Sequence, residues 1–389
     1  MRLTALASHT PEAVRAVLAA RGWDAEAAWR AATGMQPLIT LLEDITEAER
    51  EGLVHWGARA GADVLTGPGW ALIGTAASRL APLARPDRVP EALAGLAPEI
   101  ARFLTGYAEP PREWAIGGGA TLRLDRPVLI GVVNVTPDSF SDGGRFAGVD
   151  AAVAQAERLK ADGCDLIDVG GESTRPGAAR VSEHVERDRV APVLAELERR
   201  GLGPLSVDTR KSGVARAAIG AGAAVVNDVS GGMFDPALLE VAATSSAGLI
   251  LMHMRGTPDT MDALATYADV TTEVAAELRA AAGRAEAAGV GRERIVLDPG
   301  FGFAKTPAHN FRLLDELAAV VGVGYPVAVG PSRKRFLGAA TGRPVEDRDR
   351  ATAVACALAW ERGARLFRVH DVALAREALS VANATTHPT

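Results

Sequence analysis

Short apolar runs rich in β-branched residues alternate with longer amphipathic segments from residue 128 to the end of the chain. The runs are "VLIGVVNV" (128–135), "DLIDVGG" (165–171), "PLSVDT" (204–209), "AVVNDV" (224–229), "GLILMHM" (248–254), "IVLDPG" (295–300), "PVAVGPS" (326–332) and "LFRVHD" (366–371). Near-continuous apolar strands separated by helices are typical of a parallel sheet that helices cover. Eight strand–helix units predict an α/β protein with a (β/α)8 barrel, a fold of about 250 residues. A doubly wound open sheet is the alternative, and the number of strands favours closure.

The preceding part of the chain shows scattered signals and no catalytic motif. Thr10 followed by Pro11 fits a helix start, Thr46 with Glu49 fits a capping box, and "WALIGTA" fits a strand.

Two prolines and four glycines in "GYAEPPREWAIGGG" indicate a boundary between the two parts of the chain. We therefore expect an N-terminal extension of unknown role over residues 1–105, a linker over 106–119 and the barrel over 120–389. The extension is expected to be a small α/β or helical unit that the chemistry does not need.

Every predicted barrel strand ends on a polar or charged residue. In order these are Asn134, Asp168, Asp208, Asn227 with Asp228, His253, Asp298, Ser332, and Arg368 with His370. One such residue could simply cap the following loop, but eight together indicate a site, because barrel enzymes build their sites at the carboxyl ends of the strands.

The strand ends combine two kinds of chemistry. Carboxylate and amide groups suit a heterocycle that presents several N–H donors on one edge. Basic side chains, among them Arg175, Lys334 and Arg368, suit a phosphate or diphosphate. A ligand with a heterocycle at one end and an anionic group at the other satisfies both.

Two loops at the same end of the barrel have a flexible composition. "TPDSFSDGGRFAGVD" follows the first strand and "ESTRPGAARVSEH" follows the second. We expect them to act as lids that exclude water from the site. Two ordinary surface loops are the alternative.

Composition and charge narrow the class of protein. The 389 residues are 48% apolar and carry a net charge of −6, which argues against a general nucleic-acid binder. Cys164 and Cys356 form no Cys-x-x-Cys pair, so a zinc site or a disulfide framework is not expected. No run of 18 apolar residues and no signal-peptide core occur, so we expect a soluble cytoplasmic protein that binds no membrane.

Eight motifs occur in the order found in bacterial dihydropteroate synthases, which the chain resembles over about residues 116–387. They are "NVTPDSFSDGG", "DVGGESTRPG", "VDTRK", "NDVSGG", "LMHMRGTPDTM", "DPGFGFAK", "GPSRKRFLG" and "RVHD". The resemblance implies a transferase of folate biosynthesis that joins 4-aminobenzoate to 6-hydroxymethyl-7,8-dihydropterin diphosphate. It also implies a Mg²⁺ ion, a homodimer and sensitivity of the family to sulfonamides.

The same resemblance implies a role for each matching residue. The pterin would be held by Asp208, Asn227, Asp298 and Lys334, with Asp168 and Met252 as further pocket residues. The 4-aminobenzoate pocket would be lined by Thr174, Arg175, Phe303 and Ser332. Arg368 and His370 would hold the diphosphate, and Asn134 its Mg²⁺ ion. Of these, Lys334, Arg368, His370 and Asp298 would be catalytic.

No protein nucleophile is needed for this reaction, and the sequence offers no Ser/His nucleophile–base pair at the expected positions. We expect substitution of strongly dissociative character. A pterin-dependent methyltransferase and a pterin-binding paralogue without turnover are the two alternatives.

Overall fold

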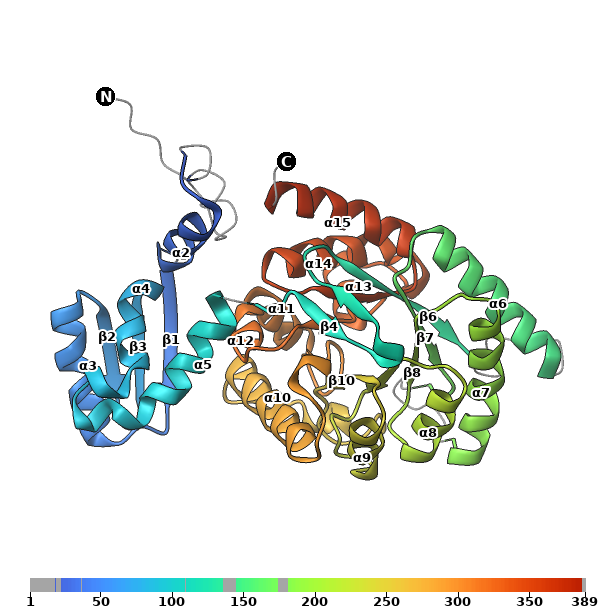
Figure 1. Ribbon diagram of the computed structural model, residues 1–389, viewed down its shortest axis with the longest axis horizontal. Coiled ribbons are helices and arrows are strands. Elements are labelled where there is room, and N and C mark those ends of the chain that lie inside the picture. The colour runs from blue at the N-terminus through green and yellow to red at the C-terminus, as the bar shows by residue number, and fades with distance from the viewer. Residues whose placement is uncertain are drawn as a thin grey trace. The chain divides into compact units, whose positions relative to one another are not determined.

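The computed structural model describes residues 18, 22–35, 37–108, 110–135, 145–173 and 181–386. The chain forms two compact units, Met1–Pro110 with Ala384–Thr389 and Pro111–Asn383 (Figure 1). The helix start expected at Thr10 and Pro11 lies outside the described residues.

The first unit is a small α/β fold around a three-stranded antiparallel sheet of order β1-β3-β2. Its α-helices and strands are α2 (Ala25–Met35), β1 (Pro37–Glu43), α3 (Glu47–Ala60), β2 (Asp63–Gly67), β3 (Trp70–Ala76), α4 (Ala77–Leu80) and α5 (Ala97–Ala108). The predicted strand "WALIGTA" is β3, and the predicted capping box of Thr46 and Glu49 begins α3. Leu53, Ile73 and Leu93 belong to a core that this unit has for itself.

The second unit is a closed barrel of eight parallel strands, as predicted. The strands are β6 (Val128–Asn134), β7 (Leu166–Gly170), β8 (Leu205–Asp208), β9 (Val225–Asp228), β10 (Gly248–Met252), β11 (Ile295–Asp298), β12 (Ala328–Val329) and β13 (Leu366–Val369). Hydrogen bonding joins them in the order β11-β10-β9-β8-β7-β6-β13-β12. A parallel bridge between Leu297 and Val327 closes the ring, and the Leu297 N–H donates to the Pro326 carbonyl over 2.9 Å.

Helices surround the barrel on its outside (Figure 1). They are α6 (Arg145–Ala161), α7 (Glu183–Arg199), α8 (Ser212–Gly220), α9 (Ala237–Thr244), α10 (Val270–Ala287), α11 (Pro307–Asp315), α12 (Ala318–Val321), α13 (Arg335–Thr341), α14 (Asp349–Glu361) and α15 (Val372–Thr386). Since α6 begins at Arg145, the last part of the expected first lid loop is helical. The remainder of that loop, and residues 174–180 of the second, lie outside the described residues.

Side chains alternate between the inside of the barrel and its helical shell. Outward residues such as Val133, Val207 and Leu251 join the core shared with the helices. Inward residues at the amino ends of the strands form a second, wholly apolar core that includes Leu166, Val225, Val296 and Leu366. Because side chains in a strand point inward at every second residue, the next inward positions are the polar strand ends.

A two-stranded hairpin, β4 (Glu113–Ala115) with β5 (Thr121–Arg123), belongs to the barrel unit. Trp114 is fully buried in the inner apolar core, and its indole N–H donates to the Arg294 carbonyl over 2.8 Å. The boundary between the two units, at Pro110 and Pro111, lies within the predicted segment 106–119, but most of that segment is not a linker. Residues up to Ala108 continue α5, and residues from Glu113 form the hairpin. The composition of the segment did not indicate that its Trp and Ile side chains are buried.

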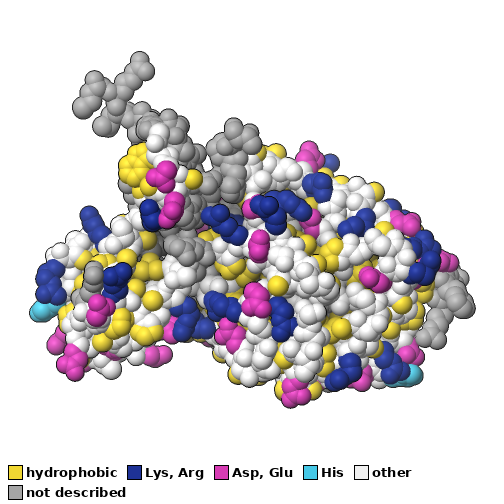
Figure 2. Space-filling view, viewed as in Figure 1, with side chains coloured by type: hydrophobic (Ala, Val, Ile, Leu, Met, Phe, Trp, Pro, Cys, Tyr) yellow, Lys and Arg dark blue, Asp and Glu magenta, His cyan; other side chains and the backbone are white. Residues whose placement is uncertain are grey.

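On the face seen in Figure 2, Lys and Arg side chains are interspersed with Asp and Glu. Within the described part of the chain, no helix is long and apolar enough to cross a membrane.

Candidate active site

The carboxyl ends of the barrel strands surround a cavity of about 550 Å³. Its walls contain seven of the predicted site residues, Asn134, Asp208, Phe303, Ser332, Lys334, Arg368 and His370. Asp168, Asn227, Met252 and Asp298 are buried on the neighbouring strands. Thr174 and Arg175 lie outside the described residues.

A buried ion triad connects three of the strands. The Arg368 guanidinium donates from Nε to Asp168 over 2.6 Å and from Nη2 to Asp208 over 2.7 Å. Asn227 donates its amide N–H to the same Asp168 oxygen over 3.1 Å. Burial disfavours the charge on Arg368, but the two carboxylates outweigh that effect and raise its pKa. Since two carboxylates share one guanidinium, burial and the remaining negative charge raise the pKa of Asp208.

Asp298 is placed by a sharp turn at the end of β11. Gly300, at φ 68°, donates its N–H to Asp298 Oδ1 over 2.7 Å. A Cβ atom at position 300 would lie 2.0 Å from the His253 carbonyl oxygen, so only glycine allows this turn. Burial raises the pKa of Asp298 to about 6, against the opposing effects of the Gly300 N–H and nearby cations.

Lys334 extends over an aromatic ring at the cavity wall. Its Nζ lies 4.0 Å from the centre of the Phe303 ring, a cation–π contact. The preceding Arg333 has a φ of 57°, a left-handed conformation that is costly for a residue with a side chain. Two hydrogen bonds from Arg333 to Asp349, 2.8 and 2.6 Å long, hold this turn in place. The strained residue thereby fixes where Lys334 points.

Ser332 and His370 form a pair that the sequence reasoning did not expect. The Ser332 hydroxyl accepts the backbone N–H of His370 over 3.1 Å and lies 2.8 Å from His370 Nδ1. A hydroxyl has one hydrogen and two acceptor sites, so both neutral tautomers of the ring fit this contact. We expect the tautomer in which Nδ1 accepts the hydroxyl hydrogen and Nε2 carries the ring hydrogen. Burial, followed by the charge of Arg368, lowers the pKa of His370 to about 3. Such a weak base does not activate Ser332 as a nucleophile, so the pair orients the imidazole.

Asn134 ends β6 in register with Gly170 of β7, which in turn pairs with Asp208 of β8. A Cβ atom built at Gly170 would lie 3.5 Å from Asn134 Oδ1 and 3.7 Å from Asp208 Oδ2. The described residues contain no group of three or more His, Cys, Asp and Glu that could hold a metal. Mg²⁺ is commonly bound by one or two protein oxygens together with substrate phosphates and water. Asn134 fits that mode of binding, in which the ligand supplies most of the metal's coordination.

Two buried groups near the site were missed by the sequence reasoning. Lys305 lines the cavity and is only 2% exposed, although the motif "DPGFGFAK" contains it. Glu172 also lines the cavity and pairs with Arg210 and Lys211. A charged residue directly after a glycine-rich turn or a strand end was the available signal for both.

A second cavity of about 790 Å³ lies beside β10 and α10. It is larger and combines Met, Leu and Ala with three arginines and Glu277, but of the polar strand ends it holds only His253, and of the residues assigned to substrate binding only Met252. Size alone would favour the second cavity. The convergence of carboxylates, amides and cations on one volume favours the first as the active site.

Comparison with known proteins identifies the family to which the barrel is similar. Residues 130–370 match the family model described as "Pterin binding enzyme". The chain is 47% identical over 266 residues to the dihydropteroate synthase of Mycobacterium leprae, covering 67% of this chain and 93% of that protein.

The barrel is also similar to solved structures of dihydropteroate synthases. The Xanthomonas albilineans dihydropteroate synthase with 4-aminobenzoic acid is 45% identical, with a TM-score of 0.66, and the match covers 71% of this chain and 100% of that one. The Burkholderia cenocepacia dihydropteroate synthase complexed with 7,8-dihydropteroate is 41% identical, with a TM-score of 0.64, and covers 71% and 96%.

The His370 geometry leads to a direct test by nitrogen NMR of the histidine side chains. We expect His370 to remain neutral and protonated on Nε2 when the pH falls to about 5, well below the ordinary histidine pKa of about 6.5. In Ser332→Ala the Nδ1 atom loses its hydroxyl donor, so the pKa of His370 should rise. Titration of His370 near the ordinary value in the wild type would contradict this assignment.

Proposed function

The chain belongs to the dihydropteroate synthases, and from that membership we propose which of its residues perform the family's reaction. As a member it is a transferase of folate biosynthesis. The reaction joins 4-aminobenzoate to 6-hydroxymethyl-7,8-dihydropterin diphosphate and releases diphosphate. The observation that carries the proposal is the single cavity where buried carboxylates meet Lys334, Arg368 and His370.

The pterin lies against the carboxylates at the base of the cavity. A pterin presents a ring N–H next to an exocyclic amino group, and the Asp298 carboxylate can accept hydrogen bonds from both. Asp208 and Asn227 bind other positions on the ring, with the buried Asp168 and Met252 behind them. Lys334, held over Phe303, donates to a ring acceptor.

The diphosphate lies against Arg368 and His370. Arg368 uses Nε and Nη2 for its two carboxylates, which leaves further N–H groups for an anion. The neutral imidazole of His370 offers its Nε2–H. We propose that Asn134 binds the Mg²⁺ ion of the diphosphate; the bound ion would stabilise the negative charge of the leaving group.

We propose that the 4-aminobenzoate binds against Phe303 and Ser332; Thr174 and Arg175, which the family resemblance assigns to the same pocket, lie outside the described residues. In the reaction the C–O bond to diphosphate breaks and the amine forms the C–N bond, losing a proton. No side chain need form a covalent intermediate, which agrees with the weak basicity of His370. The residues act by stabilising a departing anion and a cationic carbon.

We also propose that the enzyme is a cytoplasmic homodimer. Cys164 and Cys356 are both buried and unpaired, as is usual in a reducing compartment. On α14, Val354 and Leu358 are 60% and 37% exposed and lie one turn apart, and Phe311 of the contacting α11 is 39% exposed. Exposed apolar side chains that gather on adjoining helices are typical of a subunit interface.

Asp298→Asn tests the function itself. The amide would place an N–H against the N–H groups of the pterin, and a site built to hydrogen-bond a substrate does not tolerate such a mismatch. We expect kcat/KM for dihydropteroate formation to fall by roughly 10²–10⁴. Calorimetry should show a matching loss of free pterin binding, while Asp315→Asn at the exposed end of α11 should leave both unchanged. Wild-type pterin binding by Asp298→Asn would mean that the ring is held elsewhere.

Asn134→Ala tests the metal and the diphosphate. The variant should weaken Mg²⁺-dependent binding of the pterin diphosphate much more than binding of the free pterin, because only the former needs the ion. Titrations with and without Mg²⁺ measure both affinities. An equal loss for the two ligands would show that Asn134 acts on the pterin and not on the metal.

A double variant, Val354→Glu with Leu358→Glu, tests the homodimer. Two charges in an apolar interface should convert the dimer to a monomer in sedimentation experiments. Val185→Glu places a charge at a comparably exposed apolar position on α7 and should leave the dimer intact. A wild-type protein that sediments as a monomer at micromolar concentration would refute the proposal.

A further inference from the structure

Lys305 is a fully buried amine whose contacts the reaction scheme does not use. Its Nζ lies 2.8 Å from His253 Nδ1 and donates to the Gly300 carbonyl over 3.2 Å and to the Phe303 carbonyl over 3.0 Å. An ammonium has three hydrogens, so each of them has one acceptor. Two of these acceptors belong to the turn that places Asp298 and Phe303.

His253 connects this amine to the other side of the barrel wall. Its Nε2 lies 2.9 Å from Glu277 Oε2 on α10. Because Nδ1 accepts from Lys305, the neutral ring carries its hydrogen on Nε2 and donates to Glu277. The Glu277 side chain is 42% exposed and lines the second cavity. A continuous chain of polar groups thus runs from the active site through Lys305 and His253 to solvent.

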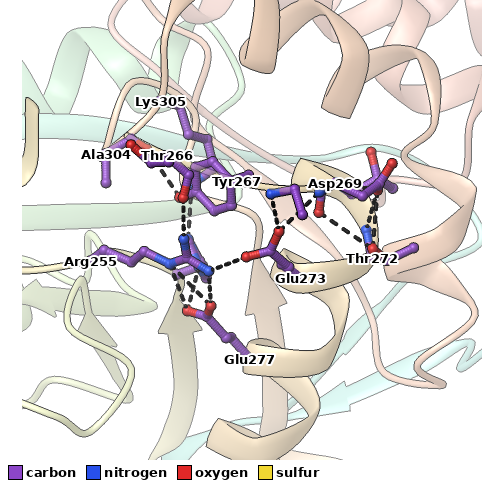
Figure 3. A network of polar contacts seen from close by, with 12 residues as sticks. Arg255, Thr266, Tyr267, Asp269, Thr272, Glu273, Glu277, Ala304 and Lys305 are labelled. Atoms are coloured by element: carbon purple, nitrogen blue, oxygen red, sulfur yellow. Dashed lines mark hydrogen bonds and ion pairs between the residues drawn. The ribbon is translucent and has the colours of Figure 1, made fainter. Parts of the chain in front are cut away.

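Arg255 binds Glu277 at the solvent end of this series of polar groups, as Figure 3 shows. Its guanidinium donates to both Glu277 and Glu273 and lies 4.0 Å from the centre of the Tyr267 ring. The Tyr267 hydroxyl donates to the Ala304 carbonyl over 3.0 Å, next to Lys305. Glu273 lies one turn before Glu277 and shares its partner Arg255, but it has no contact with His253 among the described residues.

The charges around Lys305 compete with one another. Burial lowers the pKa of Lys305 to about 7; the negative charges of Asp298 and Glu277 oppose that shift, while Arg255 and Lys334 add to it. Asp298 is surrounded by Lys334, Lys305 and Arg368, which all favour its carboxylate form. Burial and Lys305 lower the pKa of His253 to about 4, against the effect of Glu277, so its ring stays neutral.

We propose that Lys305 is a positioning residue of the pterin pocket whose buried positive charge keeps Asp298 ionised, and that Glu277, acting through His253, keeps that charge in place. This inference rests on the proposed function, since it concerns the carboxylate that binds the pterin. It assigns an effect on substrate binding to Glu277, which lies outside the active-site cavity.

The consequence is a specific pH dependence of pterin binding. The pterin needs the Asp298 carboxylate, so affinity weakens as the pH falls through the pKa of that group. Without the Lys305 charge the carboxylate is harder to ionise, and the weakening begins at a higher pH. An opposite charge nearby shifts a carboxylate pKa by about one to three units. The loss should therefore be large near pH 6 and small at alkaline pH.

The experiment is calorimetry of 6-hydroxymethylpterin with the full-length protein from about pH 5 to about pH 8. Lys305→Met should bind about tenfold more weakly than wild type near pH 6 and close to wild type at the alkaline end. Glu277→Gln should show the same pattern with about a threefold loss. Lys305→Arg, which keeps the charge, should follow the wild type. Titration of the ligand itself cancels in these ratios.

Glu273→Gln is the matched control. It removes a carboxylate that also binds Arg255, on the same helix, without touching His253, so its pH profile should match the wild type. A loss of affinity in Lys305→Met and Glu277→Gln that is equal at every pH would overturn the proposal and leave Lys305 as a structural brace. If Lys305→Met does not fold, the pH profile of Glu277→Gln tests the proposal by itself. Absent pterin binding by the wild type would instead contradict the proposed function.

Discussion

A guanidinium held between two carboxylates inside a closed barrel is the interaction on which the site depends. Arg368 on β13 reaches Asp168 on β7 and Asp208 on β8, which precede it by 200 and 160 positions in the sequence. Removing one partner of such a buried pair leaves an uncompensated charge, a change that typically costs about 3–5 kcal/mol. The triad therefore links β13 to β7 and β8, and it fixes the orientation of the three side chains at the bottom of the cavity.

Beneath this polar layer the barrel is filled mostly by apolar side chains, with Ser206 as a buried polar exception. The apolar filling includes Leu166, Val225, Val296, Leu366 and the hairpin residue Trp114. Polar side chains follow at the next inward position of the same four strands. One sheet thus places Asp168, Asn227, Asp298 and Arg368 at similar depth. Buried polar groups suit the recognition of a substrate by hydrogen bonds, since a substrate that lacks the matching groups would leave them unpaired.

The loops after the strands are held by partner residues that do not line the cavity, such as Asp349 and His253. Arg333 keeps a left-handed conformation through Asp349, and this conformation directs Lys334 toward Phe303. The turn after β11 is braced by Lys305 beneath it, and Lys305 in turn depends on His253 and Glu277. The barrel mouth is consequently linked to helices α10 and α14, which do not line the active-site cavity.

The sequence by itself determined the barrel, its eight strands and the polar ending of each, because strand periodicity and strand-end polarity are local properties. It also indicated β3 and the capping box of Thr46, whose signals lie within a few residues. The tertiary structure alone decided the pairing of Arg368 with Asp168 and Asp208, the Ser332–His370 contact and the chain from Lys305 to Glu277. These contacts join residues from 24 to 200 positions apart, and they exist only because closing the barrel brings their strands and helices together. The first strand of the hairpin, at residues 113–115, was interpreted as linker for the same reason: Trp114 is buried only because the folded barrel packs around it.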